Sequence, residues 1–134
     1  MNDVIKQWGP LVGRILISVI FIMSGLGKVM QFDAQVGYAA SHGVPAASLA
    51  IILSIVVELV AATMIIAGYR ARLGAALLLL WMIPVTFMMH AFWGVEDPMA
   101  QQIQMIMFLK NLAMMGAMLL IMAHGPGPKS LNDD

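Results

Sequence analysis

The sequence predicts an all-α integral membrane protein folded as an antiparallel bundle of four transmembrane helices. The first observation is composition: 61% of the residues are hydrophobic and 10% are charged, whereas soluble domains are nearer half apolar and a quarter charged. The second is the presence of four apolar segments, each close to the roughly 20 residues that a helix needs to cross a bilayer. These segments occupy most of the 134 residues, so we expect a single domain over residues 1–134.

Turn and cap residues indicate where the helices begin and end. Gly9-Pro10 marks the start of the first span, and Gly68 suits the C-cap of the second. Asp97-Pro98 suits the start of the last helix, because aspartate caps helix N-termini and the missing proline N–H would be unbonded there. The connection 31–46 is expected to lie on the surface as a short amphipathic turn. The spans are expected at about residues 10–30, 47–68, 73–93 and 98–124.

The distribution of charge predicts that both termini face the cytoplasm. Cytoplasmic loops of membrane proteins carry an excess of Lys and Arg. One side of the expected bundle carries five basic residues, Lys6, Arg14, Arg70, Arg72 and Lys129, and the other carries Lys28 with Asp33, Glu96 and Asp97. The net charge is zero and no basic cluster is present, so nucleic acid is not expected as a partner.

Glu58, near the middle of the second span, is the residue around which the expected site is organised. Its neighbours in sequence are apolar, and a charged group at the centre of a membrane helix costs about 3 kcal/mol on insertion scales. The carboxylate should therefore face the bundle interior and find a partner there. A rise of about 1.5 Å per residue places both Glu58 and Lys110 in the core. A Glu58–Lys110 pair is thus available, with Arg14 as the competing partner.

These polar residues also have purely structural interpretations. Glu58 and Lys110 form either a site that binds a ligand or handles a proton, or a buried pair that only fixes the helix register. Arg14 is either a partner of Glu58 or an anchor at the inner boundary that reaches the headgroups. Asn111 and Ser24 are the expected supporting hydrogen-bond donors.

His90 and Lys28 are expected at the outer boundary of the bilayer, by the same rise per residue. Lys28 either faces inward or extends outward to the headgroups. His90, close to Trp93, is an aromatic-belt residue, a hydrogen-bond partner for a quinone-type head group, or a metal or haem ligand. No haem is expected, because His42 lies in a loop and His124 at the opposite membrane face. No metal is expected either, because most of the 14 methionines stand at packing positions.

Short motifs spread over nearly the whole chain form a recognisable pattern. They are Arg14 followed by Phe21-Ile22-Met23-Ser24-Gly25 and Lys28, Gly43-Val44-Pro45, Glu58, Gly68-Tyr69-Arg70-Ala71-Arg72, His90-Ala91-Phe92-Trp93, Phe108-Leu109-Lys110-Asn111, and Gly125-Pro126-Gly127 leading to Ser130. With these motifs the sequence resembles the DoxX family of small four-helix membrane proteins. The resemblance implies a bundle in the bacterial inner membrane. Named members look like membrane subunits of oxidoreductase systems, but function transfers between relatives less well than fold does.

The expected function is a membrane subunit of a redox system that binds a quinone or similar amphiphile near the outer half of the bundle. His90 and Lys28 would contact a carbonyl of the head group, while Glu58 and Lys110 would carry or balance a proton. The absence of cysteine excludes a thiol relay, so electrons would pass through a cofactor or a partner. The expected cofactor-binding residues are Lys28, His90, Trp93, Ser24, Asn111 and Arg14.

Two other functions remain open at this point. One is a non-catalytic scaffold or assembly subunit whose buried charges only specify how the helices pack. The other is a carrier of small solutes or lipids, which would need a dimer because the sequence shows no inverted repeat. The expected partners are the lipid bilayer and either a redox subunit or further copies of this chain.

Overall fold

The computed structural model describes residues 2–132, and helices make up most of this range. The elements are α1 (Asp3–Met30), α2 (Phe32–Ser41), α3 (Ala47–Ala67), α4 (Ala71–Met89), the 3-10 turn η1 (Phe92–Gly94) and α5 (Pro98–His124). Within residues 2–132 there is no strand. α1, α3, α4 continued through η1, and α5 are each long and apolar enough to cross a membrane. The prediction of an all-α membrane bundle is confirmed.

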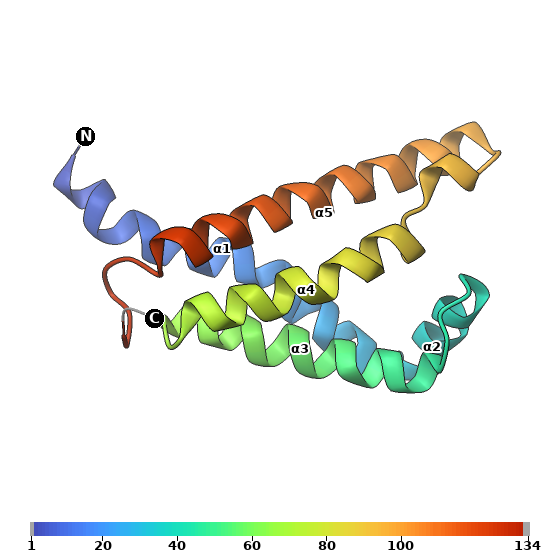
Figure 1. Cartoon of the computed structure of the whole chain (residues 1–134), viewed down its shortest axis with the longest axis horizontal. Helices are drawn as coiled ribbons and strands as arrows, with labels where there is room; N and C mark the ends of the chain where they lie inside the picture. Colours follow the sequence, from blue (N-terminus) through green and yellow to red (C-terminus); the bar gives the residue numbers. More distant parts are fainter. Residues whose placement is uncertain (1, 133–134) are drawn as a thin grey trace.

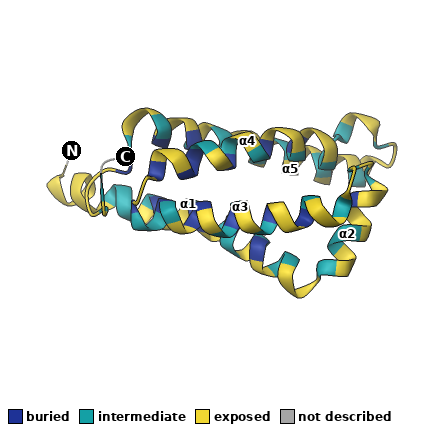
Figure 2. Cartoon of the chain, turned by 60° about the horizontal axis from the view of Figure 1, so that its bottom comes forward, coloured by how far each residue is buried: buried dark blue, intermediate teal, exposed yellow. Residues whose placement is uncertain are grey.

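The long helices form two layers, and different segments lie at the two ends of the bundle. α1 packs against α3, α3 against α4, and α4 against α5, whereas α2 packs on α3 and α1. Figure 2 shows the layer of α1 and α3 beside the layer of α4 and α5. Both termini and the α3–α4 turn lie at one end of the bundle, and α2 and η1 lie at the other (Figure 1). Within residues 2–132, α1 and α5 lack an extended contact of this kind, so one side of the bundle is open.

Local capping explains several helix boundaries. Gly68 ends α3 with a φ of 68°, the left-handed conformation that favours glycine. The Asp97 carboxylate accepts a hydrogen bond from the Ala100 N–H at 2.9 Å and so caps α5 as predicted. α1 begins earlier than expected, because the Asn2 side chain accepts a hydrogen bond from the Val4 N–H and caps a helix that continues through Pro10. Gly9-Pro10 therefore does not mark its start.

Two further boundaries differ from the sequence-based expectation. Most of the connection 31–46 is not a short turn but the ten-residue helix α2, which buries Ala39. The third span does not continue as one α-helix to residue 93. It ends at Met89, and the chain then forms η1. His90 is thus the C-cap of α4 and stands where the helix gives way to the loop.

The hydrophobic core is formed by residues of α1, α3, α4 and α5. Its buried members are Phe21, Ala61, Ala62, Ile65, Ala71, Ala75, Leu78, Met82, Met118 and Ile121. Small residues let the backbones approach, as is common between membrane helices. A Cβ atom on Gly74 would lie 3.1 Å from the Ala61 carbonyl oxygen, so α3 and α4 touch there.

Arg14 fastens the segment that follows α5 to the end of the bundle. Its side chain is buried, with 3% of the residue exposed. Nη1 donates hydrogen bonds to the carbonyl oxygens of Pro126 and Pro128, and Nη2 donates to those of Lys129 (2.8 Å) and Ile66 (3.4 Å). The interpretation of Arg14 as a headgroup anchor or as the partner of Glu58 is therefore wrong, because backbone carbonyls accept from both terminal nitrogens of the guanidinium.

Replacing Arg14 by Leu should lower the free energy of unfolding by about 3 kcal/mol, because a hydrogen bond from a charged donor contributes roughly 1.5–3 kcal/mol. Unfolding in detergent micelles, followed by circular dichroism, measures this loss. Trypsin should also cleave after Lys129 faster in the variant, because the segment is released. Arg72→Leu is the matched control, since Arg72 is exposed. Equal effects of the two substitutions would contradict the proposed role of Arg14.

Candidate functional site

The centre of the site is an ion pair between α1 and α3. The Lys28 Nζ lies 3.0 Å from both carboxylate oxygens of Glu58. It also lies 2.7 Å from the Ser24 Oγ, and that hydroxyl donates to Glu58 Oε1 at 3.1 Å. Gly25 permits the approach, since a Cβ atom there would lie 2.7 Å from the Leu59 side chain on α3. The Glu58 carboxylate therefore has a cation and a hydroxyl as partners inside the bundle.

The expected pairing of Glu58 with Lys110 or Arg14 is wrong, and the direction of the side chains explains why. Arg14 contacts Ile66, and Lys28 contacts Glu58, so the contacts run in opposite sequence order along α1 and α3. Lys28 is farther from Arg14 along α1 than Glu58 is from Ile66 along α3, so Lys28 and Glu58 start from different depths. Side chains on a helix lean toward its N-terminus. The long Lys28 side chain therefore bridges the difference in depth.

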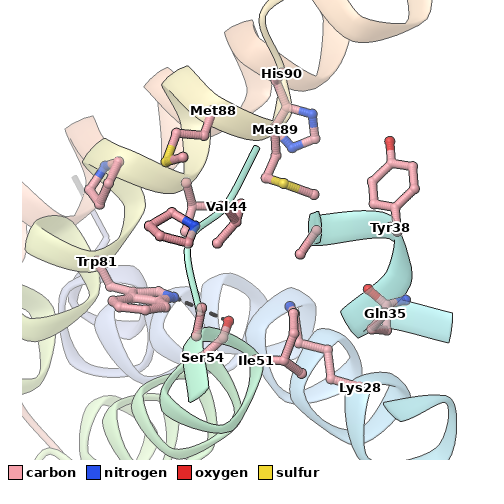
Figure 3. Close-up of a pocket in the computed structure, with 15 residues that line it drawn as sticks. Lys28, Gln35, Tyr38, Val44, Ile51, Ser54, Trp81, Met88, Met89 and His90 are labelled. Atoms are coloured by element: carbon pink, nitrogen blue, oxygen red, sulfur yellow. Dashed lines mark hydrogen bonds between the residues drawn. The ribbon is translucent and has the colours of Figure 1, made fainter. Parts of the chain in front are cut away.

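A cavity of about 400 Å³ lies between α2, α3 and α4, and Lys28 of this ion pair lines it. Most of its lining is apolar, and Figure 3 shows the few polar groups around it. The polar or amphipathic lining residues are Lys28, Gln35, Tyr38, Ser54, Trp81 and His90. The Trp81 Nε1 donates a hydrogen bond to the Ser54 Oγ at 3.1 Å, which fixes the indole at the cavity wall (Figure 3).

A smaller cavity of about 220 Å³ adjoins the first and lies among α1, α3, α4 and α5. Lys28, Trp81, Val85 and His90 line both cavities. Its other lining residues are Ile20, Phe21, Ser24, Glu58, Leu78, Met82, Met107, Lys110, Asn111 and Met114. Of the eight predicted site residues, six thus meet at the two cavities, and both members of the ion pair are among them.

His90 connects α4 to α5 at the α2 end of the bundle, and Gln104 connects α5 to α2. The His90 Nδ1 lies 2.8 Å from the Gln104 side-chain oxygen, and the Gln104 amide nitrogen donates to the Tyr38 hydroxyl at 3.4 Å. The amide oxygen is an acceptor, so this network assigns the proton to Nδ1 and leaves Nε2 of a neutral ring as an acceptor. Sequence reasoning missed both partners. Tyr38 lies in the connection 31–46, which was expected to be a surface turn, and no motif singled out Gln104 on the last helix.

Lys110 and Asn111 enter the smaller cavity from α5 but behave differently. The Asn111 side chain donates to the Thr86 hydroxyl at 3.0 Å and so fastens α5 to α4. Lys110 lines the cavity with Glu58, but among residues 2–132 its amine forms no hydrogen bond or salt bridge.

Two predicted ligand-binding residues lie outside both cavities. Arg14 is at the opposite end, where it holds the segment after α5. Trp93 belongs to an aromatic cluster with Phe87, Phe92 and Phe108, in which it packs edge-on against Phe92 and Phe108. In the part of the chain that the structure describes, no three His, Cys, Asp or Glu side chains are grouped to hold a metal ion.

The sequence of this bundle matches a known family. Residues 9–91 match the DoxX family model. This range is more than half of the chain and contains Ser24, Lys28, Glu58 and His90. The chain belongs to the DoxX family. The resemblance drawn from the sequence motifs is confirmed.

The similar proteins are themselves membrane proteins of Escherichia coli strain K12. Inner membrane protein YphA is 38% identical over 122 residues, which cover 91% of this chain and 86% of YphA. Inner membrane protein YqjF is 30% identical over 128 residues, which cover 96% of this chain and 92% of YqjF. No solved structure matches this DoxX chain. The comparisons thus support a multi-pass membrane protein.

A double-mutant cycle should measure the coupling between Lys28 and Glu58. Removing one partner of a buried ion pair leaves a charge uncompensated, so Glu58→Gln and Lys28→Met should each destabilise the fold by roughly 3 kcal/mol. The double variant should lose less than the sum by about 1 kcal/mol or more. Unfolding in detergent by circular dichroism provides the free energies.

The matched control is the cycle of Glu58→Gln with Lys110→Met. These side chains line the same cavity but form no salt bridge with each other, so their effects should add within about 0.5 kcal/mol. A larger coupling for Lys110 than for Lys28 would restore the pairing first expected from the sequence.

Proposed function

We propose that this DoxX protein is an inner-membrane subunit of a redox system that binds a quinone or similar amphiphile in the two adjoining cavities. The observation that carries the proposal is the larger cavity, mostly apolar and about 400 Å³ in volume. Ligand sites are commonly apolar clefts of roughly 300–1,000 Å³ with a few converging polar groups. Here those groups are Lys28, Tyr38 and His90, and the ion pair lies directly beside them.

The polar groups suit the chemistry of a quinone head. Lys28 lies at the wall shared by both cavities, and its three N–H groups face Ser24 and Glu58, so a quinone carbonyl would accept from it in place of one oxygen of the Glu58 carboxylate. Reduction of a quinone takes up protons as well as electrons. Glu58, bonded to Lys28 and Ser24, can carry or balance such a proton, and Lys110 supplies a second charge on the same cavity wall. The chain has no cysteine, so we assign the electron transfer to a partner.

The proposed orientation places both termini in the cytoplasm. The basic residues of α1's start, the α3–α4 turn and the segment after α5 gather at the end with the termini, whereas α2 and η1 lie at the opposite end (Figure 1). The positive-inside rule therefore directs the cavity end outward. The names of both E. coli relatives support the inner membrane as the location.

A scaffold subunit is the second candidate, and the ion pair itself favours it. Lys28 and Ser24 bond the carboxylate of Glu58 without any ligand, and the three side chains tie α1 to α3. A buried pair that only sets helix register has this form. The scaffold alternative and the ligand-binding proposal differ in whether the cavity binds a quinone.

A short-chain quinone should quench the fluorescence of Trp81 in a saturable way, because Trp81 lines both cavities. The measurement uses decylubiquinone and a Trp8→Phe/Trp93→Phe background, in which Trp81 is the remaining tryptophan. Adding Ala50→Phe, which fills the larger cavity, should weaken binding by roughly tenfold or more, about 1.4 kcal/mol.

Ala113→Phe is the control, because Ala113 is exposed on α5 and lines neither cavity. It should leave quenching unchanged. Quenching that rises linearly with decylubiquinone, or that Ala50→Phe and Ala113→Phe leave equal, would favour the scaffold.

The absence of cysteine allows a direct test of orientation. A membrane-impermeant maleimide should label Ser41→Cys, at the exposed end of α2, in spheroplasts of intact inner membrane. It should label the exposed Asn2→Cys only after the membrane is permeabilised. The reverse pattern would place the cavity end in the cytoplasm.

A further inference from the structure

Lys110 has no hydrogen-bond or ion-pair partner within residues 2–132, and it lies far from both ends of its helix. At about 1.5 Å per residue, Lys110 lies roughly 18 Å from Pro98 and roughly 21 Å from His124, the ends of α5. The hydrocarbon core is about 30 Å thick, so Lys110 lies close to its middle when α5 spans it. Lysines near helix ends extend to the headgroups, but this position is too deep for that. Its ammonium needs a counter-charge inside the membrane.

The cavity walls do not supply that counter-charge. Lys28 and Glu58 form a salt bridge and neutralise one another. His90 faces the Gln104 side chain, which carries no charge. Among the residues that the structure describes, the lining of the smaller cavity therefore carries one excess positive charge, that of Lys110.

The position of the smaller cavity indicates where an anion would enter. The cavity reaches α1 and α5, which lack an extended contact with each other within residues 2–132. Lys110 lines it and is nevertheless exposed, so the amine is reachable from that side. The neighbouring wall is apolar: Ile20 and Phe21 stand on α1, and Met107 and Met114 stand on α5 one turn to either side of Lys110. An acyl chain would contact these side chains.

We propose that this side cavity binds a single-chain amphiphile with one carboxylate, a fatty-acid-type anion. The carboxylate pairs with Lys110 Nζ, and the acyl chain lies between α1 and α5. A cavity of about 220 Å³ holds the carboxylate and the first part of one acyl chain, and the rest of the chain extends into the bilayer. A helix is about 10 Å across, so a helix of a partner protein does not fit inside the cavity. This assignment rests on Lys110 and does not require the quinone proposed above.

Dibromostearate is the probe, because its bromine atoms quench tryptophan fluorescence on contact and Trp81 lines the cavity. The protein is the full chain with Trp8→Phe/Trp93→Phe in nanodiscs of zwitterionic phosphatidylcholine. The acid should quench Trp81 saturably, whereas its uncharged methyl ester should bind at least tenfold more weakly. Lys110→Met should reduce binding of the acid to that of the ester, and Lys110→Arg should retain it.

Lys6→Met is the matched control, because Lys6 is an exposed lysine at the start of α1. It should leave binding of dibromostearate unchanged. Equal binding of acid and ester, or unchanged binding to Lys110→Met, would overturn the proposal. A third outcome would also overturn it: the parent protein is an oligomer that does not bind the acid, and Lys110→Met is a monomer. A second copy of the chain would then supply the partner of the Lys110 amine.

Measurements on the parent protein and on Ala50→Phe separate this proposal from the proposed function, because Ala50 lines the larger cavity and not the smaller one. Ala50→Phe should weaken decylubiquinone binding and leave dibromostearate binding unchanged, and circular dichroism checks that Lys110→Met is folded. Failure of the acid to bind while decylubiquinone still binds would refute only the anion site. Binding of the acid without any binding of decylubiquinone would refute only the quinone proposal.

Discussion

The ion pair between Lys28 and Glu58 is the interaction on which the architecture of this site depends. A lone carboxylate in the middle of an apolar helix is costly, so the fold must bring a cation to it. Gly25 makes this possible by letting α3 come close to α1, and Ser24 adds a hydroxyl to the pair. The pair is neutral as a whole, and it still leaves polar atoms facing two cavities. Most other polar features of the site are arranged around these two side chains.

The two ends of the bundle have opposite characters. At the end with the termini, Arg14 binds carbonyl oxygens of the segment after α5, and the hydrophobic core is closed. At the other end, α2 covers a cavity instead of a packed core, and Tyr38, Gln104 and His90 connect the helices through side chains. Backbone carbonyls hold one end, whereas side-chain hydrogen bonds connect the helices at the other. The closely packed core and the larger cavity therefore lie toward opposite ends of the molecule.

The sequence predicted the architecture and most residues of the site, but it did not predict which side chain pairs with Glu58. Composition and span length predicted the membrane bundle, and the isolation of Glu58 among apolar residues predicted a polar centre. The partner was wrong because depth counted from helix ends ignores the lean of a long side chain, which brings Lys28 to Glu58. The role of Arg14 was missed because backbone carbonyls leave no signal in a count of charges. Gln104 was missed for a related reason, since an amide beside a helix start is ordinary until its contact with His90 is known.

The contacts of Arg14 have a consequence for biosynthesis. Its acceptors at residues 126–129 follow all four long helices in the chain, so they leave the ribosome after α1 has entered the membrane. Until then the guanidinium lacks most of its final partners and must remain with water or lipid headgroups. The hydrogen bonds from Arg14 to the segment after α5 can therefore form only after the last helix has been made, so their closure is a late step of folding.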